Sequence, residues 1–277
     1  MESIDWLELC RRCVTRQREL FAATLGIAER TVYEGRGEGG DMTLELDRRC
    51  EDVIFDELEA LADEGASLLA VSEERGELTL GKGEPTARVV IDPIDGSLNA
   101  RRTIPSFSTS IAVASGETMD AVDFGFVYDF GADEEFAATR GEGATVNGRP
   151  IPRELPDTGL EIVGLESADP KWVMGPIASL EGNAYRLRVV GSIAITLCYV
   201  AAGRFDAMLS ARPCRSVDAA AAQLLVRECG GAVEIAGLGL EGAPLDLSSR
   251  YPIAAARRAE HLQTVVDAQS ASPAFAQ

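Results

Sequence analysis

The chain has 277 residues, of which 46% are hydrophobic, and a formal net charge of −19 at pH 7. This length and apolar content suit one large globular domain or two smaller ones that share a core. The negative charge disfavours non-specific binding to nucleic acid or to an anionic membrane, so an anionic ligand would need a local cationic device. The longest apolar run, from Ile193 to Ala202, is too short to span a bilayer, and residues 1–5 lack the features of a signal peptide, so we expect a cytoplasmic protein.

Residues 4 to 32 have an approximate apolar stripe among arginine and glutamate, which predicts a long amphipathic helix packed on the core. Cys10 and Cys13 form a CxxC pair in this helix, but no second pair or histidine cluster completes a zinc site. Cys10 and Arg16 also have the Cys-x5-Arg spacing of thiol phosphatases. No glycine lies between them to build a phosphate-binding loop, which disfavours that chemistry, and we expect the six cysteines to be reduced thiols.

The stretch from Glu34 to Asp41 is rich in glycine and charge and predicts a mobile loop. A second helix is predicted from Leu46 to Ala62, with its apolar residues facing inward. Asp47 lies in the first turn of that helix. A carboxylate there can be a functional residue or, equally well, a simple partner of the helix dipole.

Two adjacent acids, Glu73 and Glu74, follow a short strand predicted from Ser67 to Val71. Adjacent acids at a strand end are usually solvated. Here only a hairpin-like segment around Gly81 and Gly83 precedes the next apolar run, so two neighbouring strands ending at one edge would bring Glu73 beside the acids that follow that run.

That apolar run, Val89 to Ile91, predicts a buried strand, and it leads directly into the sequence Asp92-Pro93-Ile94-Asp95-Gly96-Ser97. In this sequence the proline fixes φ and turns the chain, the glycine lets a ligand approach the backbone closely, and the serine can cap a following helix. Its other groups are two carboxylates, the Ile94 carbonyl and exposed amides.

Hard oxygen ligands of this kind attract Mg²⁺, and free amides at the start of a helix attract phosphate. The sequence therefore predicts that a metal and a phosphate meet in one loop. The alternative is that Asp-Pro and Asp-Gly are ordinary turn dipeptides, which a lone instance would favour.

The next strands are predicted to be antiparallel and joined by turns at Gly116-Glu117 and Asn147-Gly148; they cover residues 107–114, 121–128 and 136–139. Periodicity is lost from Pro150 to Pro156, which indicates a boundary. We therefore expect an N-terminal α+β half at 1–155, a C-terminal α/β half at 156–268 and a flexible tail at 269–277.

Strands and helices alternate after the boundary, which predicts α/β organisation. The expected strands lie near residue 162, at 187–190 and at 206–209, and the expected helices start near 171 and cover 192–202 and 217–229. Asp218 opens the last of these helices, where an acid is commonly only a cap. The one histidine, His261, excludes a mechanism that depends on several histidines.

Lysine is scarce, with Lys82 and Lys171 its two occurrences, and arginine supplies the other positive side-chain charges. Abundant acid with little lysine is similar to the composition of proteins from salt-accumulating archaea and predicts a halophilic protein. An ordinary acidic enzyme is the alternative.

The motifs placed above, taken together, resemble the Mg²⁺-dependent, lithium-sensitive phosphatase superfamily of inositol monophosphatase and fructose-1,6-bisphosphatase, from about residue 4 to 268. The strongest resemblance lies in Ser72-Glu73-Glu74, in Asp92 to Ser97 with Asn99, and in Val217-Asp218-Ala219-Ala220. The motifs around Asn147-Gly148 and Gly191-Ser192 give weaker support. The resemblance implies an α/β fold, the layered α-β-α-β-α sandwich of this superfamily, usually as a homodimer.

By position, the resemblance implies functional residues of four kinds. The implied metal ligands, for two or three Mg²⁺, are Glu73, Asp92, the Ile94 carbonyl, Asp95 and Asp218. The residues implied to position the attacking water are Glu73 and Ser97, with Asp47 nearby, and those implied to hold the phosphate are Asp95, Gly96 and Ser97. The implied substrate contacts are Arg188, Gly191, Ser192 and Arg215. Hydrolysis of a phosphate ester by such a metal cluster needs no histidine.

Several positions depart from the commonest family pattern. Ala100 and Ser216 stand where the family commonly has aromatic residues, and Ala211 stands where animal-type inositol monophosphatases have an acid that contacts inositol. Arg215 resembles the arginine found there in archaeal dual-specificity enzymes. We therefore expect a fructose-1,6-bisphosphatase or dual sugar-phosphate activity on a small-molecule phosphate ester.

Three alternatives remain open: a strict inositol monophosphatase, a 3′-phosphoadenosine 5′-phosphate phosphatase, and a non-catalytic metal- or phosphate-binding protein on the same fold. A non-catalytic protein would be expected to have lost Glu73 or Ser97, and both are present.

Overall fold

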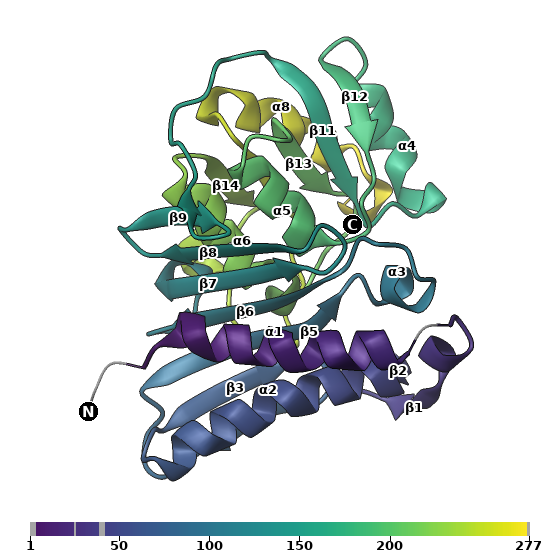
Figure 1. Ribbon diagram of the computed structural model, residues 1–277. Coiled ribbons are helices and arrows are strands. Elements are labelled where there is room, and N and C mark those ends of the chain that lie inside the picture. Colours follow the sequence, from purple (N-terminus) through teal and green to yellow (C-terminus); the bar gives the residue numbers. More distant parts are fainter. Residues whose placement is uncertain (1–3, 25, 39–41, 276–277) are drawn as a thin grey trace.

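Two β-sheets alternate with three layers of helices in the computed structural model, which describes residues 4–24, 26–38 and 42–275 (Figure 1). Helices α1 (Trp6–Ala23) and α2 (Glu45–Asp63) cover the outer face of the larger sheet. Helices α5 (Ile193–Ala201) and α6 (Ser216–Glu228) lie between the two sheets. Helices α4 (Pro170–Ser179) and α8 (Ala259–Ser270) pack on each other, and α8 packs on the smaller sheet. The order of layers is α-β-α-β-α.

The larger sheet has the strand order β10-β9-β8-β7-β6-β5-β3-β4. Its strands, in chain order, are β3 (Leu68–Ser72), β4 (Gly76–Leu80), β5 (Ala87–Asp95), β6 (Ser108–Ala114), β7 (Val122–Asp129), β8 (Glu134–Thr139), β9 (Gly143–Val146) and β10 (Arg149–Pro150). β3 and β5 are parallel, with Ser72 opposite Ile91, and the other neighbours are antiparallel. β3 and β5 therefore end at the same edge of the sheet, as expected. The prediction that the chain turns at Pro93 is wrong, because β5 continues through Asp92 and Pro93 to Asp95, with an irregular register between the two acids.

The smaller sheet has the strand order β12-β11-β13-β15-β14. Its strands are β11 (Leu160–Glu166), β12 (Ala184–Arg188), β13 (Ala207–Ser210), β14 (Ala232–Ile235) and β15 (Ile253–Ala256). β11 is parallel to both β12 and β13, whereas β15 is antiparallel to its neighbours. The sheet therefore has the α/β crossovers that the second half of the sequence predicts.

The alanine-rich helix α6 packs closely on the larger sheet because small residues face each other. A Cβ added to Gly125 of β7 would lie 2.5 Å from the Ala221 carbonyl oxygen of α6, which no real side chain tolerates. The largest apolar cluster includes residues of both sheets together with α5 and α6. The change of sheet falls at the boundary near residue 155, but because this core is shared, the division into two domains stays a prediction.

The first predicted helix is shorter than expected. α1 ends at Ala23, and a single 3₁₀ turn, η1 (Glu29–Thr31), follows. The Arg30 side chain folds back to donate hydrogen bonds to the carbonyls of Phe21 and Thr24, which satisfies the open end of α1. The helix therefore ends earlier than its apolar pattern predicts, and a nearby arginine occupies its end.

Two further expectations about local structure differ from the structure. The stretch predicted as a mobile loop from Glu34 to Asp41 begins within a short strand, β1 (Tyr33–Arg36), which pairs with the antiparallel β2 (Met42–Leu44) that follows the stretch; its residues 39–41 lie outside the described residues. The tail predicted to be flexible from 269 is helical through Ser270, and Gln269 is buried with hydrogen bonds to the carbonyls of Ser210 and Ile253.

The smaller elements are α3 (Ser97–Arg101), η2 (Met119–Ala121), α7 (Gly239–Gly242) and η3 (Pro273–Phe275). None of the described helices is both long enough and apolar enough to cross a membrane. All six cysteines are buried and free of disulfides, as predicted. Burial raises the pKa of Cys10, and that of Cys13 to about 12, so neither is a ready thiolate nucleophile.

Candidate active site

A cleft of about 500 Å³ opens where β3 and β5 end, and most of the acids singled out from the sequence meet there. Its lining includes six carboxylates and two arginines: Asp47, Glu73, Glu74, Asp92, Asp95, Asp218, Arg101 and Arg215. Strand ends supply four of these acids, whereas Asp47 and Asp218 come from the first turns of α2 and α6. Residues distant in the sequence therefore converge on one point.

The irregular last residues of β5 and the glycine that follows them are shaped by local contacts. The Ile94 amide donates to Asp92 Oδ1 over 3.0 Å, and the pairing of β5 with β6 is irregular between Asp92 and Asp95. Gly96 has φ +92°, and a Cβ there would lie 3.0 Å from the Gly191 carbonyl oxygen. Only glycine fits this conformation and this close approach.

The expectation that Ser97 caps the following helix is wrong. Gly96 occupies the cap position of α3, and Ser97 is the first residue of that helix. The Ser97 hydroxyl instead donates backward to the Ile94 carbonyl over 2.8 Å. The hydroxyl and the carbonyl predicted to act in the site are therefore joined directly.

Asp95 is held by the start of α5. Its Oδ2 accepts hydrogen bonds from Ser192 Oγ and from the Ala194 amide, each over 2.6 Å. Ser192 is the N-cap of α5, and its hydroxyl also accepts from the Ile195 amide. Oδ2 of Asp95 is thus fixed in place by the first turn of a helix that lies outside the cleft lining.

The crowding of buried acids raises their pKa values. For Asp92, burial is the main cause, and the charges of Asp95, Asp218 and Asp47 add to it. Burial also raises the pKa of Asp95 and of Asp218. The pKa of Asp47 rises to about 7, through burial first and then through the charge of Glu74. These carboxylates are held close together at a cost that a bound cation would remove.

The donor set fits a hard divalent cation. Asp47 Oδ1 is buried and has no hydrogen-bond partner among the described residues. The acids of the cleft and the Ile94 carbonyl offer oxygen ligands only, which is the set that Mg²⁺ prefers. A buried, unpartnered carboxylate oxygen beside other carboxylates is the structural observation that favours a metal here.

Arg215 links two acids of the cleft. Its Nη1 forms an ion pair with Glu73 Oε1, and its amide donates to Asp218 Oδ2 over 2.8 Å. Asp218 therefore does cap α6, as the simpler interpretation of a helix-start acid expects, while its side chain also lines the cleft.

The other predicted substrate contacts lie outside the cleft lining. Gly191 and Ser192 form the turn before α5 and sit directly behind Gly96 and Asp95. Arg188 ends the edge strand β12, is exposed, and donates to the neighbouring Leu187 carbonyl. Nothing in this geometry assigns the roles of the three residues, which stay predictions.

Two buried acids beside the cleft were not identified from the sequence. Glu51 of α2 is fully buried and accepts from the Ser72 hydroxyl and from the amides of Glu74 and Arg75, which shapes the turn that carries Glu73. Glu166 ends β11 and accepts from the turn before α5. Glu51 could have been found as an acid inside the apolar stripe of a helix, and Glu166 as an acid at the end of an apolar strand.

A second cleft, of about 640 Å³, lies between the chain after β10 and the start of α8. Near it, the side chains of Asp157, Glu260 and His261 bring potential ligand atoms within 4.8 Å of one another. Arg258 already forms ion pairs with Asp157 and Glu260 there. Asp157 and Glu260 are exposed, whereas Asp92 and Asp95 of the first cleft are buried, so the burial of charge that favours a cation is found in the first cleft.

Comparison with known proteins gives consistent matches over most of the chain. Residues 8–272 match the model of the inositol monophosphatase family. The fructose-1,6-bisphosphatase/inositol-1-monophosphatase of Thermococcus kodakarensis is 30% identical over 271 residues, which cover 97% of this chain and 99% of that protein. The protein of the same name from Methanothermobacter thermautotrophicus is 32% identical over 272 residues, covering 94% of this chain and 96% of that protein.

Two further matches extend this picture. The Nus factor SuhB of Escherichia coli is 35% identical over 236 residues, which cover 82% of this chain and 84% of that protein. Among solved structures, the crystal structure of an inositol monophosphatase-fructose 1,6 bisphosphatase superposes with a TM-score of 0.82 at 27% identity, covering 96% of this chain and all of that one.

Proposed function

The chain belongs to the inositol monophosphatase family, whose phosphatases depend on metal, and from this premise we propose that it hydrolyses small sugar or polyol phosphates. The predicted family and the predicted fold class are both confirmed. We assign it dual activity on fructose 1,6-bisphosphate and inositol 1-phosphate. The names of the archaeal relatives support this assignment, as does Arg215 in the cleft.

The observation that carries the proposal is the convergence of buried carboxylates on one cleft with an unpartnered Asp47 oxygen. We propose that two or three Mg²⁺ bind there. The proposed ligands are Glu73, Asp92, the Ile94 carbonyl, Asp95 and Asp218. Bound Mg²⁺ would supply Lewis acidity and neutralise the charge of the phosphate.

The residues of the chain would position the reactants. We assign Glu73 and Ser97, with Asp47 behind them, to orienting the attacking water in line with the ester oxygen. The amides of Gly96 and Ser97 are assigned to the phosphate oxygens. Arg215 is assigned to an anionic part of the substrate, which then competes with Glu73 for its guanidinium group.

The remaining residues predicted to contact the substrate lie outside the cleft lining, so we propose indirect or peripheral roles for them. Ser192 is buried behind Asp95, so we assign it an indirect role through the hydrogen bond that it donates to Asp95. We assign Gly191 to the backbone that borders Gly96. Arg188 is kept as a contact for a part of the substrate that extends beyond the cleft lining.

A homodimer is the assembly that we propose, in the cytoplasm and without a nucleic-acid or membrane partner. The exposed apolar side chains of α4 and of the β12 region, Met174, Ile177, Tyr185 and Val189, lie at the open edge of the smaller sheet and support an interface there. Light scattering on the purified protein tests the assembly; a mass near 29.5 kDa would contradict it.

A panel assay tests the function. Phosphate release is measured from fructose 1,6-bisphosphate, inositol 1-phosphate and 3′-phosphoadenosine 5′-phosphate, each with Mg²⁺ and with EDTA. We expect Mg²⁺-dependent release from the first two substrates. Release from inositol 1-phosphate alone would indicate a strict inositol monophosphatase, and release from none would favour a non-catalytic protein.

A further inference from the structure

Glu166 is a buried acid that the proposed mechanism does not use. It ends β11 with 1% of its surface exposed, and it does not line the cleft. Its Oε1 accepts from the Val190 amide over 3.0 Å and from Thr196 Oγ1 over 2.7 Å, while its Oε2 accepts from the Gly191 amide over 2.9 Å. Burial raises the pKa of this carboxyl to about 7. Burial of this carboxylate costs free energy, and the hydrogen bonds that offset the cost all come from one turn and the helix that follows it.

The turn that Glu166 holds abuts the loop assigned to metal and phosphate. Asn99 Nδ2 donates to the Val190 carbonyl over 2.8 Å. The Gly191 carbonyl oxygen lies 3.0 Å from the position of a Cβ on Gly96, so the two backbones are in contact. A shift of one turn would therefore be transmitted to the other.

The same turn also carries the residue that orients Asp95. Ser192, which follows Gly191, donates its hydroxyl to Asp95 Oδ2 over 2.6 Å. Glu166 is therefore connected to Asp95 in three steps. Glu166 accepts a hydrogen bond from Gly191, Gly191 is joined to Ser192 by the peptide bond, and Ser192 donates a hydrogen bond to Asp95. The path starts in the smaller sheet and ends at β5 of the larger sheet.

We propose that Glu166 is a positioning residue, which sets the affinity of the cleft for divalent metal by fixing the Val190–Ser192 turn and through it Asp95. The inference rests on the proposed function for the identity of the metal. Both oxygens of Glu166 act as acceptors, so a glutamine at this position would place an NH₂ group against an N–H or O–H donor. The turn would have to move to relieve that contact.

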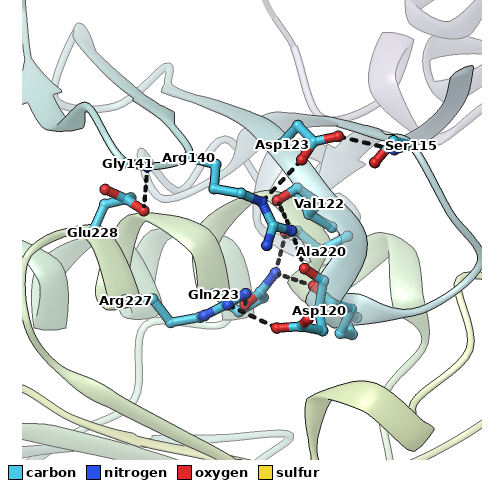
Figure 2. Close-up of polar contacts among 11 residues, drawn as sticks. Ser115, Asp120, Val122, Asp123, Arg140, Gly141, Ala220, Gln223, Arg227 and Glu228 are labelled. Atoms are coloured by element: carbon cyan, nitrogen blue, oxygen red, sulfur yellow. Dashed lines mark hydrogen bonds and ion pairs between the residues drawn. The ribbon is translucent and has the colours of Figure 1, made fainter.

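The decisive experiment compares Glu166→Gln with Glu228→Gln. Glu228 is a matched control because it is also a buried acid that holds a turn, and it does not line the cleft. It lies at the opposite end of α6 from Asp218 and accepts hydrogen bonds from the amides of Gly141 (Figure 2) and Gly143 over 2.9 and 3.0 Å. Mg²⁺ titrations followed by thermal melts measure binding without any substrate. Mg²⁺ activation of phosphate release is measured in parallel.

Because the thermal shift rises with the logarithm of the Mg²⁺ concentration and has no plateau, we define the Mg²⁺ midpoint as the concentration that raises the melting temperature by a fixed increment over its value in EDTA. We expect Glu166→Gln to raise this concentration by about 10-fold, the lower end of the range for residues that orient metal ligands. Glu228→Gln should lower the melting temperature and leave the Mg²⁺ midpoint unchanged. Equal Mg²⁺ midpoints for the two variants would overturn the inference, because a merely structural role lowers stability alone.

Thr196→Val provides a second variant in case Glu166→Gln does not fold. It removes one of the donors to Oε1 and should raise the Mg²⁺ midpoint in the same direction by a smaller factor. An unchanged midpoint in Thr196→Val would then count against the inference. If the wild-type chain binds Mg²⁺ but releases no phosphate, the proposed function fails while the positioning role is still decided by the melts.

Discussion

The two ends of α6 place acidic side chains in opposite settings. At its first turn, Asp218 lies in the cleft among Asp92 and Asp95, and burial raises the pKa of all three. At its last turn, Arg227 pairs with Asp120 over 2.9 Å, and nearby Arg140 pairs with Asp123 over 2.9 Å (Figure 2). One helix therefore connects a region of crowded acids with a region where acids and arginines are matched.

The crowded acids at the first turn of α6 are what a ligand-binding site requires, whereas the ion pairs at its last turn are typical of a surface that contributes to folding. Partly exposed ion pairs such as Arg227 with Asp120 contribute roughly 0 to 1 kcal/mol each. Buried carboxylates without cations destabilise the folded chain until a cation arrives. Under the proposed function the crowded end is a binding site, whereas the matched end serves the fold, and each prediction below tests one side of this contrast.

The largest expected effect comes from Asp95→Asn. It removes a charged ligand from the proposed metal site, and because even changes around metal ligands cost about 10- to 100-fold, the loss of phosphate release should exceed about 100-fold. The fold should persist, since the substitution also relieves repulsion with Asp218. Assays and melts check both. Asp123→Asn, at the matched end, is the control and should keep its activity; near-normal turnover in Asp95→Asn would remove the site assignment.

Glu73→Gln should lower kcat more than it raises KM, because the carboxylate is assigned to the water as well as to the metal. Steady-state kinetics on inositol 1-phosphate measures the two constants separately. The substitution also removes the ion pair with Arg215, so Arg215→Ala is the partner experiment that shows how much of the change comes from that pair. An effect confined to KM would show that the role in orienting water is wrong.

Addition of Mg²⁺ should stabilise the wild-type chain by about 2.7 kcal/mol at a concentration of 100 times Kd, since the ion binds the folded state. A thermal melt with Mg²⁺ and with EDTA measures this shift. The shift should be much smaller in Asp95→Asn and full in Asp123→Asn. An equal melting temperature with Mg²⁺ and with EDTA would mean that the crowded acids do not bind Mg²⁺ in the folded state.

The convergence of the acids could be predicted because it depends on local rules. Short apolar runs before Glu73 and Asp92 predicted two strands, and the expectation that these neighbouring strands end at one edge agrees with their parallel pairing. What could not be predicted depends on partners distant in the sequence. The carboxylate oxygens of Glu166 accept hydrogen bonds from the amides of Val190 and Gly191, which follow β12 and lie more than twenty residues further along the chain. A sequence pattern reports burial and period, but it does not report which distant amide a buried acid will meet.

The site residues divide in the same way. Asp95 and Gly96 belong to a contiguous motif, and the turn at its end follows from the positive φ of Gly96. Arg188 was assigned by position alone, and its exposure follows from its place at the end of an edge strand, which depends on the strand order. Strand order is set by the packing of whole layers and cannot be derived from a single segment.

Salt should stabilise the whole molecule, because 45 acids oppose 26 basic residues and the excess negative charge repels itself. The Debye length falls from about 10 Å at 0.1 M to about 3 Å at 1 M, so simple screening should be nearly complete by about 1 M. A thermal melt across a KCl series measures this. A further gain above 1 M would indicate ion exclusion or cation binding, and a midpoint unchanged between 0.1 and 2 M would refute the halophilic interpretation.

The smallest expected effect comes from Arg227→Ala at the matched end of α6. The arginine is 24% exposed and its partner Asp120 is 44% exposed, so water screens the pair, and its loss should cost about 0.5 kcal/mol. For a chain of this size that corresponds to a fall in melting temperature of about 1 to 2 °C. Phosphate release and the Mg²⁺ midpoint should stay at wild-type values. A double-mutant cycle with Asp120→Ala isolates the pair. A coupling energy above about 2 kcal/mol would mean that this end, like the cleft, contains charges that depend on a single partner, and the contrast between the two ends of α6 would no longer hold.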